Sequence, residues 1–195
     1  MPTDGTKAEE ADKPGGHNGP LARARPRSIP SSEHWQPPYC GDIGLKIRAD
    51  GTWLYRGSPI LRAALVKLFA SVLRREADGR TYLVTPAEKV DVAVEDAPFL
   101  AVEMAVQGAG RAQELIFRTN VDDVVRCGAR HPLRFALQEP GGGLKPYVLV
   151  RGRLEALLTR ALLYDLALIA VEEARGGRSV PGVWSGGVFF AMDAG

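Results

Sequence analysis

The two halves of this 195-residue sequence repeat each other weakly at a spacing of 95 positions. At this spacing Arg56-Gly57 coincides with Arg151-Gly152, and Pro86 coincides with Pro181. The segments that follow the two Arg-Gly pairs both carry apolar residues at helical spacing. A repeat of this length indicates two copies of one supersecondary unit, here a hairpin, a helix and a strand after a proline. The sequence therefore predicts two related modules.

The first half is expected to open with a hairpin. Alternating residues over 43–48 and the apolar run 53–55 flank Asp50-Gly51, a pair typical of tight hairpin turns. A helix is expected to begin at Ser58-Pro59, because proline is tolerated in the first helical turn, and to end before Gly79. Short β-branched runs bounded by glycine or proline predict further strands at 81–84, 90–94, 100–106, 113–118, 131–137, 147–150 and 183–192.

Two glycine-rich segments of the second half are expected to be hairpin turns, Gly108-Ala109-Gly110 and Gly141-Gly142-Gly143. Leucines over 154–174 cover more than one helical face, which predicts a long and largely buried helix. The expected fold class is α+β, with mostly antiparallel sheets and one long helix in each module.

The expected domain organisation has three parts. Residues 1–38 are rich in proline, glycine, serine and charge and have little apolar periodicity, so a disordered N-terminal tail outside the fold is predicted. The two modules are expected at 39–97 and 98–195.

Composition limits the cellular setting and the partners. No apolar run is long enough for a membrane span or a secretory signal, and the two cysteines are far apart in sequence, so a cytoplasmic protein without membrane contact is expected. The net charge of +2 is too small to predict nucleic-acid binding. Residues 111–160, however, carry nine basic against five acidic residues, and an anionic ligand is expected to bind there.

Seven motifs resemble those of a bacterial family known as domain of unknown function family 1285. Individually they are short, but their order and spacing are specific, and together they cover nearly everything after Pro38. They are CGDI at 40–43, DGTWLYRGSPI at 50–60, LVTPAE at 83–88, DAPF at 96–99, FRTN at 117–120, HPLR at 131–134 and PYVLVR at 146–151.

The resemblance implies a duplicated core with a C-terminal domain superficially similar to a pleckstrin-homology fold. It also implies a site at the interface between the domains for a small, anionic, nucleotide-like ligand, and a role in signal transduction that could involve a signalling protein as partner. It implies no activity. Clefts between modules are common places for ligand sites.

Polar residues at predicted strand ends are the candidate ligand-binding groups, because guanidinium groups hold anionic oxygens in pairs and tyrosine can stack on a ring. Each residue taken alone also fits a purely structural role in a turn, a strand start or a helix-start ion pair. The candidates are Thr119, Asn120, His131, Arg134, Tyr147, Arg151, Glu155 and, on the first predicted helix, Arg62.

Two other classes of function stay open. An enzyme could use His131, with or without Cys127, whose neighbours Arg126 and Arg130 would lower the pKa of a thiol. A protein-interaction module is the other alternative. No catalytic residue is assigned, and no cofactor or metal is expected, because phosphate-loop motifs and paired metal ligands are missing from the sequence.

Overall fold

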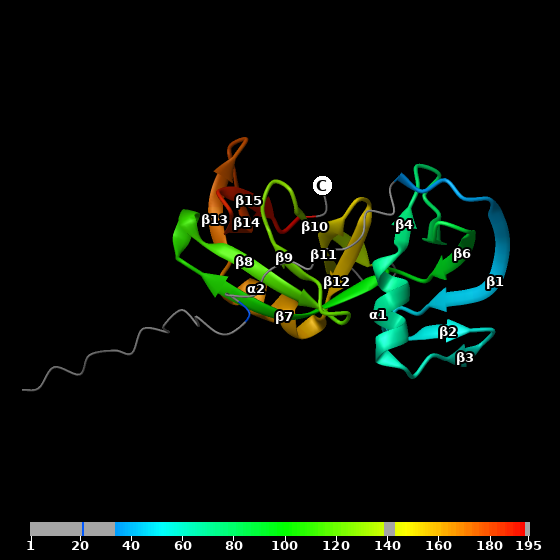
Figure 1. Cartoon of the computed structure of the whole chain (residues 1–195). Coiled ribbons are helices and arrows are strands. Elements are labelled where there is room, and N and C mark those ends of the chain that lie inside the picture. The colour runs from blue at the N-terminus through cyan, green and yellow to red at the C-terminus, as the bar shows by residue number, and fades with distance from the viewer. Residues whose placement is uncertain (1–20, 22–33, 139–142, 194–195) are drawn as a thin grey trace, which may run out of the picture.

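The computed structural model describes residues 21, 34–138 and 143–193. Within these residues the chain forms two six-stranded sheets, one three-stranded sheet and two α-helices. The N-terminal sheet lies at one end of the molecule and the other two sheets lie at the opposite end, with α1 between them (Figure 1). The protein is therefore of the α+β class, as the sequence predicts.

The N-terminal sheet has the strand order β3-β2-β1-β6-β5-β4. Its strands pair antiparallel except for β1 and β6, which pair parallel in the middle. Trp53 and Ile47 are fully buried in the core of this sheet, where Phe69 of α1 packs on Trp53. The elements are β1 (Tyr39–Ile47), β2 (Trp53–Tyr55), β3 (Ser58–Pro59), α1 (Ala63–Ser71), β4 (Leu73–Arg75), β5 (Thr81–Val84) and β6 (Lys89–Val94).

The second large sheet has the order β10-β11-β12-β7-β8-β9, and the small sheet has the order β13-β14-β15. One pair is parallel, β12 with β7, and the other pairs are antiparallel. The elements are β7 (Phe99–Gln107), β8 (Glu114–Thr119), β9 (Val124–Arg126), β10 (Leu133–Gln138), β11 (Gly143–Arg151), β12 (Leu154–Leu158), α2 (Arg160–Leu168), β13 (Val171–Arg175), β14 (Arg178–Ser185) and β15 (Val188–Ala191), with a short 3-10 turn at Gly110–Ala112.

The element order confirms that one unit occurs twice, but the predicted match of the two prolines was wrong, because Pro86 precedes β6 whereas Pro181 lies within β14. The series β1-β2-β3-α1-β4-β5-β6 and the series β10-β11-β12-α2-β13-β14-β15 both consist of three antiparallel strands, a nine-residue helix and three antiparallel strands. Arg56-Gly57 turns β2 into β3, and Arg151-Gly152 turns β11 into β12. The strands β7, β8 and β9 come between the two copies and extend the second one.

Both predicted long helices were wrong in extent. Ser58-Pro59 is not a helix start but the edge strand β3, whose partner is β2. The segment 154–174 holds β12, α2 and β13. The leucines at 154, 157 and 158 have helical spacing, but burial along β12 alternates from residue to residue, which is the strand period, and Leu157 lies on the less buried face. Thr159, in an extended conformation, separates the strand from α2.

Most of the predicted strands are present, with adjusted ends. The predicted strand 183–192 is two strands, β14 and β15, joined at Gly186-Gly187, where both residues have positive φ. The turn predicted at Gly108-Ala109-Gly110 is confirmed between β7 and β8. Gly141 and Gly142 of the other predicted turn lie outside the described residues. The similarity to a pleckstrin-homology fold stays a prediction.

Leu21 belongs to the segment predicted to lie outside the fold, yet it is buried. It is 5% exposed and packs with Ala105 and Ile116 of the second large sheet. The carbonyl of Trp35 accepts a hydrogen bond from Arg74. The prediction that all of residues 1–38 lie outside the fold therefore does not hold at Leu21 and Trp35.

Candidate functional site

The segment that joins the two large sheets runs from Glu95 to Pro98, between the end of β6 and the start of β7. Asp96 in this segment accepts hydrogen bonds from the Lys145 ammonium at 2.6 Å and from the Tyr147 hydroxyl at 2.7 Å, both on β11. Burial works against ionisation of Asp96, but these two hydrogen bonds outweigh it and hold the pKa of the carboxyl below its ordinary value. Asp96 therefore ties the linking segment to the second large sheet as a carboxylate.

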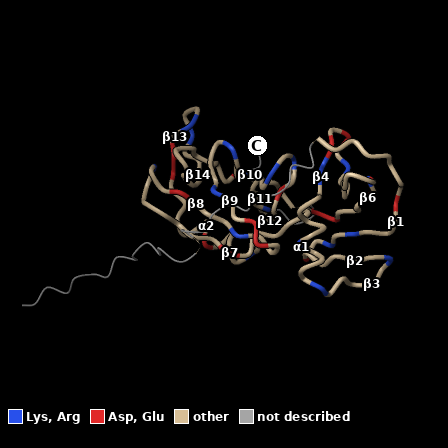
Figure 2. The backbone as a smooth tube through the Cα atoms, viewed as in Figure 1, with Lys and Arg blue, Asp and Glu red and all other residues tan. Residues whose placement is uncertain are grey.

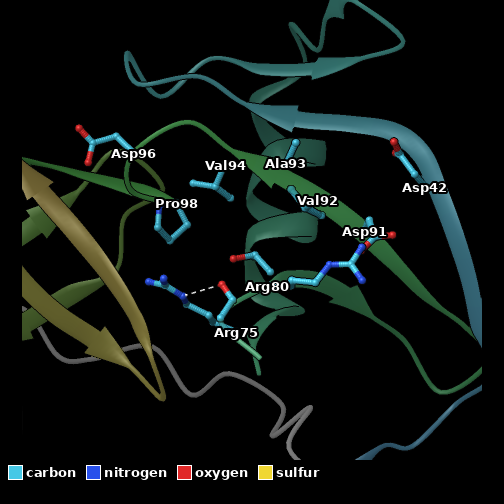
Figure 3. Close-up of a pocket in the computed structure, with 11 residues that line it drawn as sticks. Asp42, Arg75, Arg80, Asp91, Val92, Ala93, Val94, Asp96 and Pro98 are labelled. Atoms are coloured by element: carbon cyan, nitrogen blue, oxygen red, sulfur yellow. Dashed lines mark hydrogen bonds and ion pairs between the residues drawn. The ribbon is translucent and has the colours of Figure 1, made fainter. Parts of the chain in front are cut away.

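A cavity of about 400 Å³ lies beside this segment (Figure 3), and we name it the junction cavity. It has a charged side and an apolar side. The residues that line it are Asp42, Arg75, Gly79, Arg80, Thr81, Asp91, Val92, Ala93, Val94, Asp96 and Pro98.

Two arginines enter the junction cavity from the β4–β5 hairpin and differ in their partners. The Arg80 guanidinium pairs with Asp91 at 2.6 Å. Arg75 donates its Nε–H to the Gly79 carbonyl at 3.1 Å, and no carboxylate within the described part of the chain pairs with it. In Figure 3 the guanidinium of Arg75 lies on the side of Pro98, whereas that of Arg80 points to Asp91. The terminal nitrogens of Arg75 are thus available to an anionic group.

The strand wall next to Arg80 is held by a network of aromatic and charged groups. Asp91 also accepts a hydrogen bond from the Tyr39 hydroxyl, and the Tyr39 and Tyr82 rings meet edge to face at 6.3 Å. The Lys89 ammonium lies 4.6 Å from the Tyr82 ring centroid. The hydrogen bond to Asp78, together with burial, raises the pKa of Tyr82 to about 12, so its hydroxyl stays a donor at neutral pH. The side chains on this side of the junction cavity are therefore held in place by hydrogen bonds and ring contacts within the protein.

Three predicted residues gather behind Asp96 on the second large sheet. Arg134 forms a two-pronged ion pair with Glu155, with both distances 2.6 Å, and its guanidinium lies 4.1 Å from the Tyr147 ring centroid. Tyr147 in turn donates to Asp96. Burial, and then the hydrogen bond to Asp96, raise the pKa of Tyr147. These three side chains do not line the junction cavity, and they are connected to it only through the hydrogen bond of Tyr147 to Asp96.

Two other predicted residues, His131 and Arg151, line a different cavity, which is described below. Arg151 donates to Asp123 at 2.6 Å and to the carbonyl of Ala70 at the end of α1. It therefore holds the second large sheet against the N-terminal half. The eight predicted residues therefore do not line one cavity of the described chain.

The remaining predicted residues bond to the local backbone or lie away from the junction cavity. Thr119 is fully buried, and its hydroxyl accepts backbone N–H groups of the loop that ends β8. Asn120 pairs with the backbone of Leu100 through both its backbone N–H and its side-chain oxygen. Arg62 is exposed at the start of α1, makes no side-chain cap there and does not line the junction cavity.

Cys127 does not have the surroundings of a nucleophile. It is 1% exposed, and burial raises the pKa of its thiol to about 12. The thiolate is the reactive form, and the thiol predominates by far at neutral pH. Within the described residues no group of three or more His, Cys, Asp and Glu side chains is arranged to hold a metal ion.

The basic segment 111–160 is largely neutralised by ion pairs. Six of its nine basic residues pair with carboxylates, and Figure 2 shows basic and acidic residues interspersed along the backbone. Sequence reasoning placed the site in this segment and missed Arg75, Arg80 and Asp96. The turn pair Asp78-Gly79 between two arginines, and Asp96 within the DAPF motif, are the signals that could have indicated them.

Comparison with known proteins gives the family. Residues 30–97 match the model of the N-terminal domain of unknown function DUF1285, and residues 98–192 match that of the DUF1285 C-terminal domain. The chain belongs to the DUF1285 family. A search of curated proteins returned no match.

Two solved DUF1285 structures are similar to this chain. One, from Silicibacter pomeroyi DSS-3, is 46% identical, covers 87% of this chain and 91% of its own, and has a TM-score of 0.78. The other, from Shewanella baltica OS155, is 30% identical, covers 65% of this chain and 91% of its own, and has a TM-score of 0.50. None of the described helices in this DUF1285 protein is long and apolar enough to span a membrane.

Proposed function

We propose that this DUF1285 protein is a small-molecule binding or sensory protein whose ligand occupies the junction cavity. The ligand is small, anionic and nucleotide-like. The observation that carries the proposal is the position of Arg75, which lines a cavity of about 400 Å³ at the linking segment and pairs with no carboxylate among the described residues. A guanidinium fork of this kind suits phosphate or carboxylate oxygens.

The other walls fit the remainder of such a ligand. Val94 and Pro98 supply apolar surface for a flat ring, and the carboxylate of Asp42, which already accepts the Gly44 N–H at 2.7 Å, offers further acceptor sites for sugar hydroxyls. Pockets that combine apolar walls with a few placed polar groups are typical small-molecule sites. This combination favours a phosphorylated ligand with a ring over a bare ion.

The linking segment connects a ligand in the junction cavity to the second large sheet. Asp96 lines the cavity and is bonded to Lys145 and Tyr147 of the second large sheet, so an occupant of the cavity contacts a group that both halves share. We propose that this DUF1285 protein acts in the cytoplasm as a component of signal transduction.

The experiment is a thermal-unfolding screen of the full chain against inorganic phosphate, nucleoside mono-, di- and triphosphates and cyclic mononucleotides. A ligand at 100 times its dissociation constant stabilises by about 2.7 kcal/mol, which for a chain of this size raises Tm by roughly 5–10 °C. Arg75→Gln is expected to remove about half of that shift, because a tenfold weaker ligand at the same concentration stabilises by only about 1.4 kcal/mol. Arg62→Gln is the matched control, because Arg62 is an exposed arginine of the same half that does not line the junction cavity.

Two results would count against the proposal. One is a panel in which no phosphorylated compound raises Tm. The other is an equal Tm shift in the wild type and in Arg75→Gln, which would place any binding elsewhere on the protein.

A further inference from the structure

A second cavity, of about 580 Å³, lies in the C-terminal half, and we name it the β9–β10 cavity. It is lined by β9, by the loop between β9 and β10, by the end of β11 and by Gly186. Its charged side chains and its histidine are Glu114, Asp123, Arg126, Arg130, His131 and Arg151. None of these residues lines the junction cavity.

The charges of the β9–β10 cavity do not balance. Arg126 pairs with Glu114, and Arg151 pairs with Asp123 at 2.6 Å. Arg130 has no carboxylate partner in the part of the chain that the structure describes. The cavity therefore holds one cation in excess, before any proton on His131 is counted.

The loop that carries Arg130 is rigid. Gly128 and His131 exchange two backbone hydrogen bonds, 3.2 and 3.1 Å long, which close a tight turn over Ala129 and Arg130. The Ser185 hydroxyl, itself buried, donates to the Cys127 carbonyl at 2.8 Å. A Cβ on Gly186 would lie 3.1 Å from that same carbonyl, so the β14–β15 turn also packs closely against the loop. A preorganised loop loses little entropy when it binds a ligand.

His131 supplies a second polar group with a defined orientation. Its Nδ1 lies 3.0 Å from the Leu149 carbonyl oxygen, which can only accept, so Nδ1 carries the hydrogen. In the neutral ring, Nε2 is then an acceptor. A guanidinium together with an imidazole nitrogen matches a phosphate group, because Nε2 accepts from a P–OH when the ring is neutral and donates to an anionic oxygen when the ring is protonated.

We propose that the β9–β10 cavity is a second ligand site, which binds the phosphate group of a small phosphomonoester. Arg130 contacts the anionic oxygens and Nε2 of His131 forms a hydrogen bond with a further phosphate oxygen, while the apolar side chains of Val125 and Val150 contact the organic part. Arg151 is not assigned to the ligand, because Asp123 and the Ala70 carbonyl already hold its guanidinium. This site is separate from the junction cavity and does not depend on the proposed function.

The test is an NMR titration of the ¹⁵N-labelled full chain with inorganic phosphate, at an ionic strength held constant with chloride. Saturable shifts are expected at the backbone amides of Gly128, Ala129 and Arg130. Arg130→Gln is expected to weaken this binding about tenfold, as the loss of a charge-assisted hydrogen bond does. Arg153→Gln, which removes an exposed arginine that does not line the cavity, is expected to leave the affinity unchanged.

The variants also separate this site from the junction cavity. Arg75→Gln is expected to leave the shifts at Gly128–Arg130 intact. Equal affinity in the wild type and in Arg130→Gln would overturn the proposal. So would shifts that do not saturate, or shifts confined to the amides of Gly79 and Arg80, since phosphate would then bind at the junction cavity alone.

Discussion

Asp96 ties the linking segment to the second large sheet through its carboxylate. Its side chain is 14% exposed, and its two donors, Lys145 and Tyr147, are two positions apart on the same strand and on the same face of it. A carboxylate with two donors is stabilised in its charged form, and removing the charge leaves the Lys145 ammonium partly buried beside it. The contribution of Asp96 to stability should therefore depend on pH.

Asp96→Asn is expected to lower the free energy of unfolding by about 2 kcal/mol at pH 7. The pKa of Asp96 is lowered by folding from its ordinary value of 3.8, so this contribution is complete above roughly pH 5 and is lost as the pH falls through the folded-state pKa. Urea unfolding of both proteins between pH 7 and pH 3 measures the difference. A difference that stays constant over this range contradicts the account, and Asp165→Asn, an exposed carboxylate on α2, is the control.

The two cysteines should differ in reactivity. Cys40 is exposed and Cys127 is buried with a raised pKa, so a thiol reagent at pH 7.5 is expected to modify one thiol in the native chain and two in urea. Cys40→Ser should remove the native reaction. Rapid native labelling of Cys127 in that variant would show an accessible thiol and would revive the alternative of a cysteine nucleophile.

The helix α2 buries leucines on one face and exposes a leucine on another. Leu162 and Leu166 face the core, with Leu166 fully buried, whereas Leu168 near the helix end is 85% exposed. The helix is thus amphipathic, with one apolar face used and another left in solvent. The leucine content of the segment overstates how much of it is buried.

Leu166→Ala is expected to lower the free energy of unfolding by about 3 kcal/mol, because it leaves a cavity in a packed core. Leu168→Ala is expected to change it by less than about 0.5 kcal/mol. Chemical denaturation of the two variants makes the comparison with the same substitution on the same helix. Equal losses would mean that α2 is buried on both faces, as the sequence alone predicts.

The same segment explains how far the sequence predicts the fold. The strands β5, β6, β7 and β8 could be predicted, because glycine or proline bounds each β-branched run. The division of 154–174 into β12, α2 and β13 could not, because leucines at 154, 157 and 158 have helical spacing and only pairing with β7 and β11 selects the strand. Tertiary contacts decide such segments.

At the scale of the molecule, the duplicated unit is completed differently in its two copies. In the N-terminal copy, β1 and β6 pair and close one sheet. In the C-terminal copy, β7 pairs with β12 and the last three strands form a sheet of their own. The repeat was predictable from the Arg-Gly pairs. The junction cavity was not, because its arginine comes from an ordinary charged hairpin, while the basic segment that attracted the prediction is mostly ion-paired.

The most direct test of the account is calorimetric titration of the full chain with the nucleoside phosphate that raises Tm most in the screen. We expect saturable binding. The affinity of the junction cavity for this nucleoside phosphate is expected to fall about tenfold in Arg75→Gln and to stay unchanged in Arg62→Gln. An affinity in Arg75→Gln equal to that of the wild type would contradict it, because the junction cavity would then not hold the ligand.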